Sequence, residues 1–350
     1  MAVGERCEVA LRVRNPGSRS TAVTRLTDEV GDRTRAEVVV GPVAPGGHAE
    51  ATYALSTEQR GVQRLGPLGA RVEDPFGLAR RSTVAAGLSA VVVLPPTVSL
   101  DPLPAAVGDE PELGTHAMVA SSTVDEEFTG LRGYVAGDDV RRIHWPSTAR
   151  TATPVVRQFE VPWQHRTTVL LDLRQSRHDS ASFERAVVVA ASVVALCARR
   201  GELLRLGTTE EPDPPFVPAE SELDRLLDQL ALVQALPAEG VDLAGAVEQA
   251  TRAATGRLVI CTGALEREEL ARVTSAAARA GVAVVVTTLD RAPAPAAATS
   301  DSGVLRVPRV GLREDGGAAR LHWDGRADLR AAWRRVGSVA ATAAPAAGRR

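Results

Sequence analysis

Polar chemistry is concentrated between Gly133 and Arg150, where eighteen residues hold two adjacent carboxylates, three arginines, a histidine and a tryptophan. Such residues can serve acid–base catalysis, hold phosphate groups, or read a protein partner. Asp138 and Asp139 follow a glycine. This pattern is typical of a tight turn in which the Asp side chains accept hydrogen bonds from backbone amides. The simplest interpretation of Trp145 is a ring buried at a domain junction. The segment therefore predicts either a buried cluster of ion pairs, called a hub below, or a surface that binds a partner through Arg and Trp side chains.

A second candidate follows the apolar run that ends at Leu171, where Asp172, Arg174 and Ser176 alternate along the chain. In open α/β sheets, ligands bind outside the carboxyl ends of strands, where strand order reverses. An Asp-x-Ser-x-Ser loop at this edge would offer oxygen ligands to Mg²⁺. Arg174 stands where the first serine is needed, and its permanent charge repels a divalent cation. We therefore expect a degenerate, metal-free site in which Asp172 pairs with Arg174 or caps the next helix.

Motifs of common enzyme classes are not found in the sequence. A phosphate loop of the G-x-x-x-x-G-K type is impossible without lysine, and no G-x-S-x-G elbow or H-E-x-x-H helix occurs. A hydrolase built on His144 with Asp138 or Asp139 would need a nucleophile and an oxyanion site that the sequence does not indicate. We expect a non-enzymatic protein without a cofactor. The alternative is a metal-dependent ligand-binding or hydrolytic domain that uses Asp172, Ser176 and the Asp138–Asp139 pair.

The composition is that of an ordinary globular protein, with 44% hydrophobic and 24% charged residues. All 41 basic residues are arginine, and the formal net charge of -2 gives no general attraction to nucleic acid. Cys7, Cys197 and Cys261 lie in separate apolar runs, which indicates buried, reduced thiols rather than a disulfide or metal framework. The longest apolar run, from Ala186 to Ala198, is too short to cross a bilayer. As written, the sequence predicts a cytoplasmic protein.

The order of elements predicts a β domain followed by an α/β domain. Short alternating segments broken by turn residues indicate an antiparallel, Ig-like β-sandwich over residues 1–95. Residues 96–164 hold a linker and the polar segment described above. Apolar strands then alternate with helical patterns, which predicts a doubly wound, mainly parallel α/β domain over residues 165–290. Residues 291–350 are expected to form a C-terminal extension with a partly disordered tail.

The run from Asp125 to Glu160 resembles the signature of the bacterial domain-of-unknown-function family fifty-eight (DUF58). The matching positions are Phe128, Leu131, Arg132, Tyr134, Gly137, Asp138, Asp139, Arg141, Ile143, Trp145, Ala149 and Arg150. A further stretch, which leads to Asp-Pro-Phe-Gly-Leu at residues 74–78, extends the resemblance to about residues 3–290. Gly133, Ala136 and Pro146 depart from the family pattern, which commonly carries Glu, Pro and a basic residue there.

The resemblance implies a von Willebrand factor A-like α/β domain and a partner ATPase of the MoxR-type AAA+ class. Family members usually carry two transmembrane helices before the β-sandwich, whereas Met1 lies almost directly before the first predicted strand. We therefore expect membrane association only if the gene begins further upstream.

The function expected from this resemblance is an interaction or scaffold role beside a MoxR-type ATPase, in assembly or maturation of cell-envelope or other complexes. The residues expected to form its partner or interdomain hub, the signature hub, are Arg132, Tyr134, Gly137, Asp138, Asp139, Arg141, His144, Trp145 and Arg150.

Overall fold

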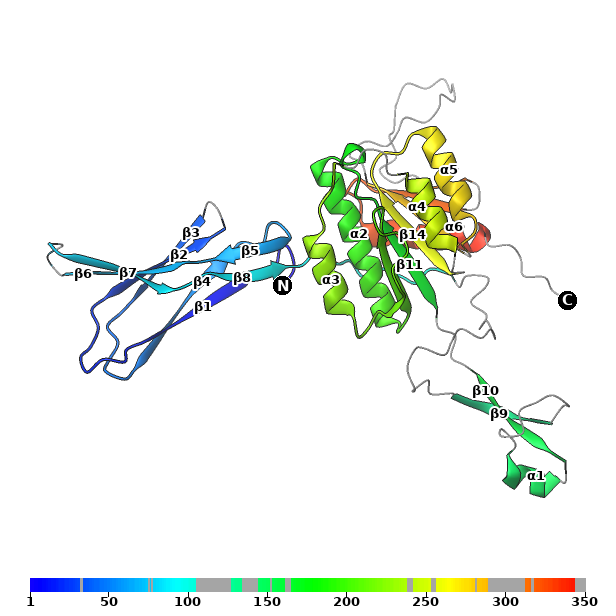
Figure 1. Cartoon of the computed structure of the whole chain (residues 1–350), viewed down its shortest axis with the longest axis horizontal. Helices are drawn as coiled ribbons and strands as arrows, with labels where there is room; N and C mark the ends of the chain where they lie inside the picture. Colours follow the sequence, from blue (N-terminus) through cyan, green and yellow to red (C-terminus); the bar gives the residue numbers. More distant parts are fainter. Residues whose placement is uncertain are drawn as a thin grey trace.

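A computed structural model of the whole chain gives the architecture (Figure 1). It describes residues 1–31, 34–74, 76, 78–104, 127–133, 144–151, 153–160, 165–237, 242–252, 256–280, 282–288, 312–315 and 318–343. Within these residues the chain forms an N-terminal β region, a two-stranded unit with a short helix, and a mixed sheet covered by helices.

Two antiparallel sheets form the N-terminal region. Their strands alternate between inward apolar and outward polar residues, so each sheet has one buried face. One sheet pairs β1 (Cys7–Arg14) with β4 (His48–Leu55). The other has the order β7-β6-β2-β5-β8, with β3 beside β2. Its strands are β2 (Thr24–Val30), β3 (Thr34–Val40), β5 (Gly61–Leu65), β6 (Leu68–Glu73), β7 (Arg80–Ala86) and β8 (Ser89–Val93). The prediction of antiparallel strands is confirmed.

The two N-terminal sheets share an apolar core in which Val30 and Leu65 of one sheet meet Leu55 of the other. A polar pair lies inside it, since the Tyr53 hydroxyl donates to Asp28 Oδ2 at 2.6 Å. Burial raises the pKa of Tyr53, and the hydrogen bond to Asp28 raises it further. The phenol therefore stays protonated and remains a donor for the buried carboxylate.

The described residues of the run from Asp125 to Glu160 form a small unit, the signature unit. β9 (Glu127–Gly133) and β10 (Val155–Glu160) pair antiparallel, and α1 (Trp145–Thr151) lies between them in the chain. The helix is attached to β10 by two hydrogen bonds: the His144 amide donates to Val155 O at 2.8 Å, and the Val155 amide donates to Thr148 Oγ1 at 3.1 Å.

A seven-stranded mixed sheet with the order β13-β12-β11-β14-β15-β17-β16 forms the centre of the α/β region. β12, β11, β14, β15 and β17 are parallel, and the two edge strands pair antiparallel. The strands are β11 (Arg166–Leu171), β12 (Leu203–Thr208), β13 (Val217–Pro218), β14 (Arg257–Thr262), β15 (Val282–Thr287), β16 (Leu312–Asp315) and β17 (Ala318–His322). The chain first runs from β11 out to β12 and later returns to β14 on the other side. Strand order therefore reverses between β11 and β14.

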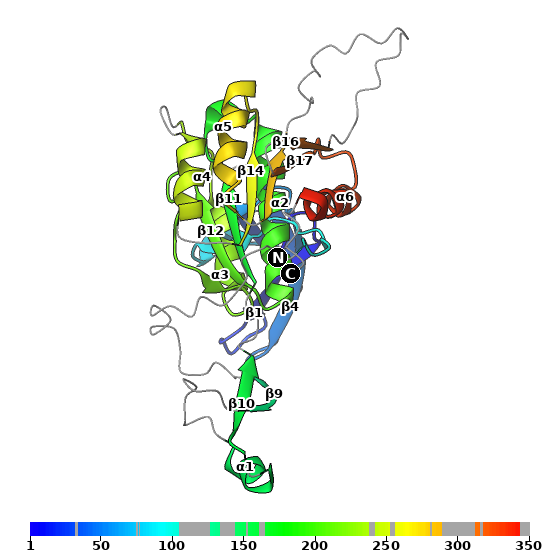
Figure 2. The same cartoon turned by 90° about the vertical axis from the view of Figure 1, so that its right-hand side faces the viewer.

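Helices cover both faces of this sheet (Figure 2). On one face, α2 (Ser180–Arg199), α3 (Leu223–Leu232) and α6 (Leu329–Ala343) share a core with the strands. On the other face, α4 (Leu243–Arg252) and α5 (Arg267–Ala277) form a second core. Two-sided burial explains why β14 and β15 are buried along their whole length and are mostly apolar. The prediction of a mainly parallel sheet between two helical layers is confirmed.

The α/β region continues past residue 290, where the sequence analysis placed its end. β17 adds to the sheet beside β15, with Ala283 opposite Ala318. α6 then buries Trp333, whose indole Nε1 donates to Asp101 O at 2.9 Å. This bond ties α6 to the segment that leaves β8, so residues 312–343 belong to the α/β core rather than to a separate extension.

Arg60 joins the β region to the α/β region. Its Nε donates to Leu230 O at 3.0 Å and its Nη2 donates to Val233 O at 2.6 Å, which satisfies carbonyls at the C-terminal end of α3. Arg60 also forms an ion pair with Glu184 of α2 and lies over the Phe183 ring. One buried guanidinium thus contacts two helices of the neighbouring region.

Among the described helices, α2 has the length and apolar composition of a membrane span. However, 72% of its most apolar window is buried inside the protein, in the core formed with β11 and β14. Its composition is therefore explained by burial between the sheet and its neighbouring helices.

Candidate functional site

The candidate site lies at the carboxyl edge of the mixed sheet, where strand order reverses. Asp172 directly follows β11, and Thr262 is the last residue of the adjacent β14. The Asp172 amide donates to Cys261 O at 2.9 Å, so parallel pairing continues one residue past β11. Asp172 is completely buried, which requires its charge to be compensated.

Arg174 compensates that charge by donating hydrogen bonds to both carboxylate oxygens of Asp172. Its Nε lies 2.9 Å from Oδ1 and its Nη2 lies 2.8 Å from Oδ2, which is a bidentate pair. The Arg174 amide also donates to Oδ1 at 3.1 Å, and the Thr262 hydroxyl donates to Oδ2 at 2.7 Å. The predicted pairing of Asp172 with Arg174 is confirmed. The next helix is capped instead by Asp179, which accepts the Ser182 amide.

A second carboxylate completes the coordination of Arg174. Glu269, in the first turn of α5, places Oε1 2.5 Å from Arg174 Nη1 and forms an ion pair with Arg177 at 3.0 Å. Burial alone would lower the pKa of Arg174, but hydrogen bonds and charges from Asp172 and Glu269 outweigh burial and raise it. The guanidinium therefore carries a fixed charge between two buried carboxylates, in the manner of a bound cation.

This arrangement leaves few oxygen atoms for a metal ion. Both Asp172 oxygens and one Glu269 oxygen accept from Arg174, and Ser176, the other predicted ligand, is exposed in the short 3-10 helix η2 (Gln175–Arg177). No group of three or more His, Cys, Asp or Glu side chains with metal-site geometry occurs among the described residues. The chemistry that the cluster can perform is structural: it joins the loop after β11 to β14 and α5.

His178 links the loop after β11 to α2 through its two ring nitrogens. Its Nε2 donates to Asp172 O at 2.9 Å, and its Nδ1 lies 3.3 Å from Ser182 Oγ. Burial lowers the pKa of His178 below 6.5, although the Asp172 charge partly opposes this effect. In the range just below pH 6.5 the unfolded chain binds more protons than the folded chain, so stability falls as the pH drops.

We expect His178→Gln to lose less stability than the wild type between pH 7.5 and about pH 5.5, because glutamine keeps a donor for Asp172 O but does not titrate. Urea unfolding at the two pH values measures this difference. Burial also lowers the pKa of His322, so the variant should keep part of the pH dependence. Equal losses in variant and wild type would contradict the assignment to His178.

The signature hub is described only in part. Tyr134, Gly137, Asp138, Asp139 and Arg141 lie outside the described residues. Arg132 lies on β9, opposite Val156 of β10. His144 is half-buried, with Nδ1 2.8 Å from Ser147 Oγ. Arg150, in the last turn of α1, is exposed, and its expected pairing with a turn carboxylate stays a prediction.

The expected burial of Trp145 is wrong. Its side chain is 68% exposed at the start of α1. The seven-residue helix is too short to cover a large ring, and proline follows directly. Of the two alternatives for this segment, an exposed tryptophan favours a surface that contacts a partner over a buried hub.

Sequence reasoning missed Glu269 and Arg177 as members of the Asp172 cluster. A guanidinium has five donors, so a buried Arg174 needs more acceptors than one carboxylate supplies. That count could have prompted a search for a second acid. Glu269 could not be singled out, because acids in the first turn of a helix are common for reasons of helix polarity.

The cysteines are free, as expected. Burial raises the pKa of Cys197 and of Cys261 to about 12, so these thiols stay protonated and unreactive. Cys7 differs from the prediction in being half-buried, since it begins β1 where the N-terminal core is thin.

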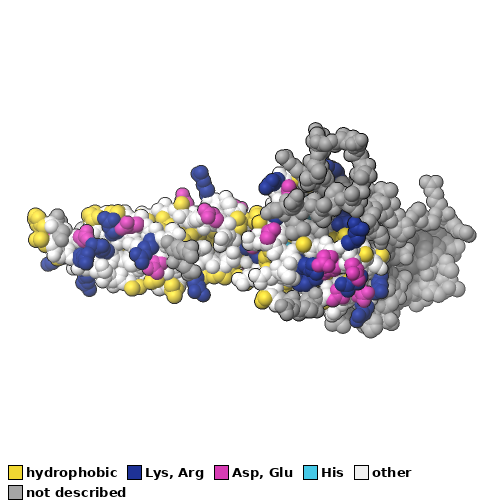
Figure 3. Space-filling view, turned by 90° about the horizontal axis from the view of Figure 1, so that it is seen from above, with side chains coloured by type: hydrophobic (Ala, Val, Ile, Leu, Met, Phe, Trp, Pro, Cys, Tyr) yellow, Lys and Arg dark blue, Asp and Glu magenta, His cyan; other side chains and the backbone are white. Residues whose placement is uncertain are grey.

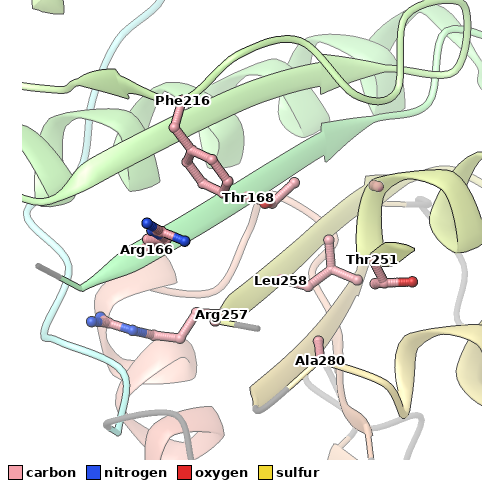
Figure 4. A pocket seen from close by; sticks show the side chains of 9 residues that line it. Arg166, Thr168, Phe216, Thr251, Arg257, Leu258 and Ala280 are labelled. Atoms are coloured by element: carbon pink, nitrogen blue, oxygen red, sulfur yellow. The ribbon is translucent and has the colours of Figure 1, made fainter. Parts of the chain in front are cut away.

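A small cavity among the described residues lies at the opposite, amino edge of the sheet (Figure 4). Its lining residues are Arg166, Thr168, Phe216, Ala250, Thr251, Gly256, Arg257, Leu258 and Ala280. Two guanidinium groups lie over the Phe216 ring, with Arg205 at 4.1 Å and Arg166 at 5.7 Å from the ring centroid. The predicted site residues are not among this lining, so the cavity is separate from the Asp172 cluster.

Comparison with known families places this geometry in context. Residues 130–296 match the family model described as "Protein of unknown function DUF58". This part of the chain belongs to the DUF58 family. The DUF58 match begins on β9, includes the Asp172 cluster, and ends after β15. The expected resemblance is confirmed over this range, whereas the N-terminal β region lies outside it.

Other comparisons add little to the DUF58 assignment. No curated protein matches the chain. Among solved structures, red sea bream transglutaminase matches with 23% identity and a TM-score of 0.20, over 26% of this chain and 13% of that chain. A similarity of this extent carries no argument about fold or function.

Proposed function

We propose that this DUF58 protein is a non-enzymatic interaction protein that works with a MoxR-type AAA+ ATPase in assembly or maturation of cell-envelope or other complexes. The observation that carries the proposal is the bidentate pair of Arg174 with Asp172 at the edge where the sheet would bind a ligand. Because the chain's own cation fills that position, the α/β region acts through its outer surfaces.

The finer fold assignment belongs to this proposal. We infer a von Willebrand factor A-like α/β domain from the reversal of strand order at β11 and β14 and from the short antiparallel edge strand β13. We likewise infer an Ig-like arrangement of the N-terminal sheets. Both inferences are supported by the strand order together with the sequence resemblance.

Trp145 is the side chain that we assign to ATPase docking. It is a large exposed aromatic among the described residues of the signature unit, and Arg150 is exposed on the same short helix. Tryptophan and arginine are enriched among the residues that supply most of the binding energy in protein interfaces. The signature unit therefore offers an anchor without further rearrangement.

The proposal is tested by measuring the binding of a MoxR-type ATPase from the same organism. Biolayer interferometry follows this binding in the apo, ADP and ATP-analogue states. We expect binding in at least one nucleotide state and a loss of about tenfold or more for Trp145→Ala. Phe76→Ala is the matched control, because Phe76 is also an exposed aromatic (83%) but lies in the β region. Failure to bind in every state would refute the partner, and equal affinity of Trp145→Ala and wild type would refute the docking surface.

The alternative, a metal-dependent ligand-binding or hydrolytic domain, needs free oxygen atoms on Asp172. The geometry supports this alternative less well, because Arg174 and Thr262 already donate to both of them. A metal would have to displace a buried guanidinium that is held by two carboxylates.

A further inference from the structure

Strand β7 has an uncovered edge at the end of the β region away from the α/β region (Figure 1). It is the outermost strand of its sheet and pairs with β6 on one side. Every residue from Leu78 to Ala90 is exposed, so within the described chain no element covers this strand. An uncovered edge presents unpaired amide and carbonyl groups that can join another strand.

Apolar side chains accompany this edge. Leu78 is 87% exposed, Val84 is 68% exposed and Leu88 is 74% exposed. Figure 3 shows exposed hydrophobic side chains along the β region, including its end farthest from the α/β region. Proline, which would block a further strand, does not occur in β7. Arg80 and Arg81 give the edge some protection against unspecific pairing.

We propose that β7 pairs antiparallel with β7 of a second copy of this chain, with the two Thr83 residues facing each other across a two-fold axis. In this register Arg80 lies opposite Ala86, Arg81 opposite Ala85, and Ser82 opposite Val84. All seven residues of the strand are paired, and each arginine faces a small neutral side chain. The segment is therefore complementary to itself, as a two-fold interface requires.

The same register explains the exposed leucines. Leu78 and Leu88 lie two residues beyond the two ends of β7, outside any strand, so this register brings Leu78 of one copy near Leu88 of the other. A parallel, in-register pair would instead set Arg80 against Arg80 and Arg81 against Arg81, which is unfavourable.

The association should be weak, because one added strand pair buries less surface than a stable dimer interface. Sedimentation velocity of the full chain, from about 1 µM to about 300 µM, should show a reversible shift from monomer to dimer. A monomer at every concentration would overturn the proposal.

Charges introduced on the two-fold axis test the register. Thr83 is exposed, so Thr83→Arg and Thr83→Glu should fold normally, yet each should weaken the dimer by about tenfold or more because like charges meet at the axis. An equimolar mixture of the two variants should restore association, and Ala85→Glu should strengthen it through Arg81 of the other copy. Thr34→Arg, at an exposed threonine of β3, is the matched control. A dimer that is unaffected by both Thr83 variants would overturn the proposal.

Discussion

Arg174→Ala is expected to lower the free energy of unfolding by about 3–5 kcal/mol. The substitution leaves the buried carboxylates of Asp172 and Glu269 without the cation that they share. Removal of one partner from a buried ion pair costs more than the pair itself contributes, because the remaining charge stays desolvated. Urea unfolding followed by circular dichroism at pH 7 measures the loss.

Arg272→Ala is the control for this prediction. Arg272 also pairs with an aspartate, Asp242, at 3.3 Å, but both side chains are at least half exposed. Exposed pairs contribute about 0–1 kcal/mol, so this variant should remain close to the wild type. Similar losses for Arg174→Ala and Arg272→Ala would show that the Asp172 cluster is not a central structural element.

Gly263→Ala is expected to destabilise the protein by about 3 kcal/mol or more, because the added methyl group has no room. A Cβ at this position would lie 1.8 Å from the backbone oxygen of Arg177 and 2.9 Å from His178 Nδ1. The neighbouring Ala264 amide donates to that same Arg177 oxygen at 2.7 Å, so the two loops cannot separate without losing this bond. Thermal and urea unfolding provide the measurement.

Gly41→Ala supplies the comparison, since nothing lies within 4 Å of a Cβ at that position and its backbone is not left-handed. It should change stability by less than about 1 kcal/mol. If Gly263→Ala were tolerated equally well, the close approach of the loops after β11 and β14 would be refuted.

The local part of the candidate site could be predicted from the sequence. Asp172 and Arg174 are two residues apart, directly after a strand, so their mutual pairing follows from short-range geometry and from the cost of a buried unpaired charge. Glu269 lies 95 residues from Arg174, and its role depends on how α5 is placed beside β14. Contacts at such separation follow from tertiary structure, which spacing alone does not give.

The helices and parallel strands between residues 166 and 287 could be predicted because buried strands and amphipathic helices carry strong patterns. β17 and α6 were not predicted. β17 has only five residues and includes Arg320 and His322, whereas β14 and β15 are mostly apolar. The burial of Trp333 against the segment after β8 is a long-range contact that α6 makes only in the folded chain.

The prediction for Trp145 was wrong although it followed a strong general rule. Large aromatic rings are usually buried, but the ring lies on a helix of seven residues within a small unit of two strands. Among the described residues of this unit the ring stays 68% exposed. The exception is informative, because an exposed tryptophan that is not covered by its own unit is a candidate for intermolecular contact.

Calorimetric titration of the wild-type protein with Mg²⁺ and with Mn²⁺, to about 10 mM, tests most directly the claim that Arg174 fills the ligand position of this sheet. We predict no saturable heat, because the guanidinium holds both oxygens of Asp172. Saturable binding of either ion that is lost in Asp172→Asn would contradict the account and restore the metal-dependent alternative.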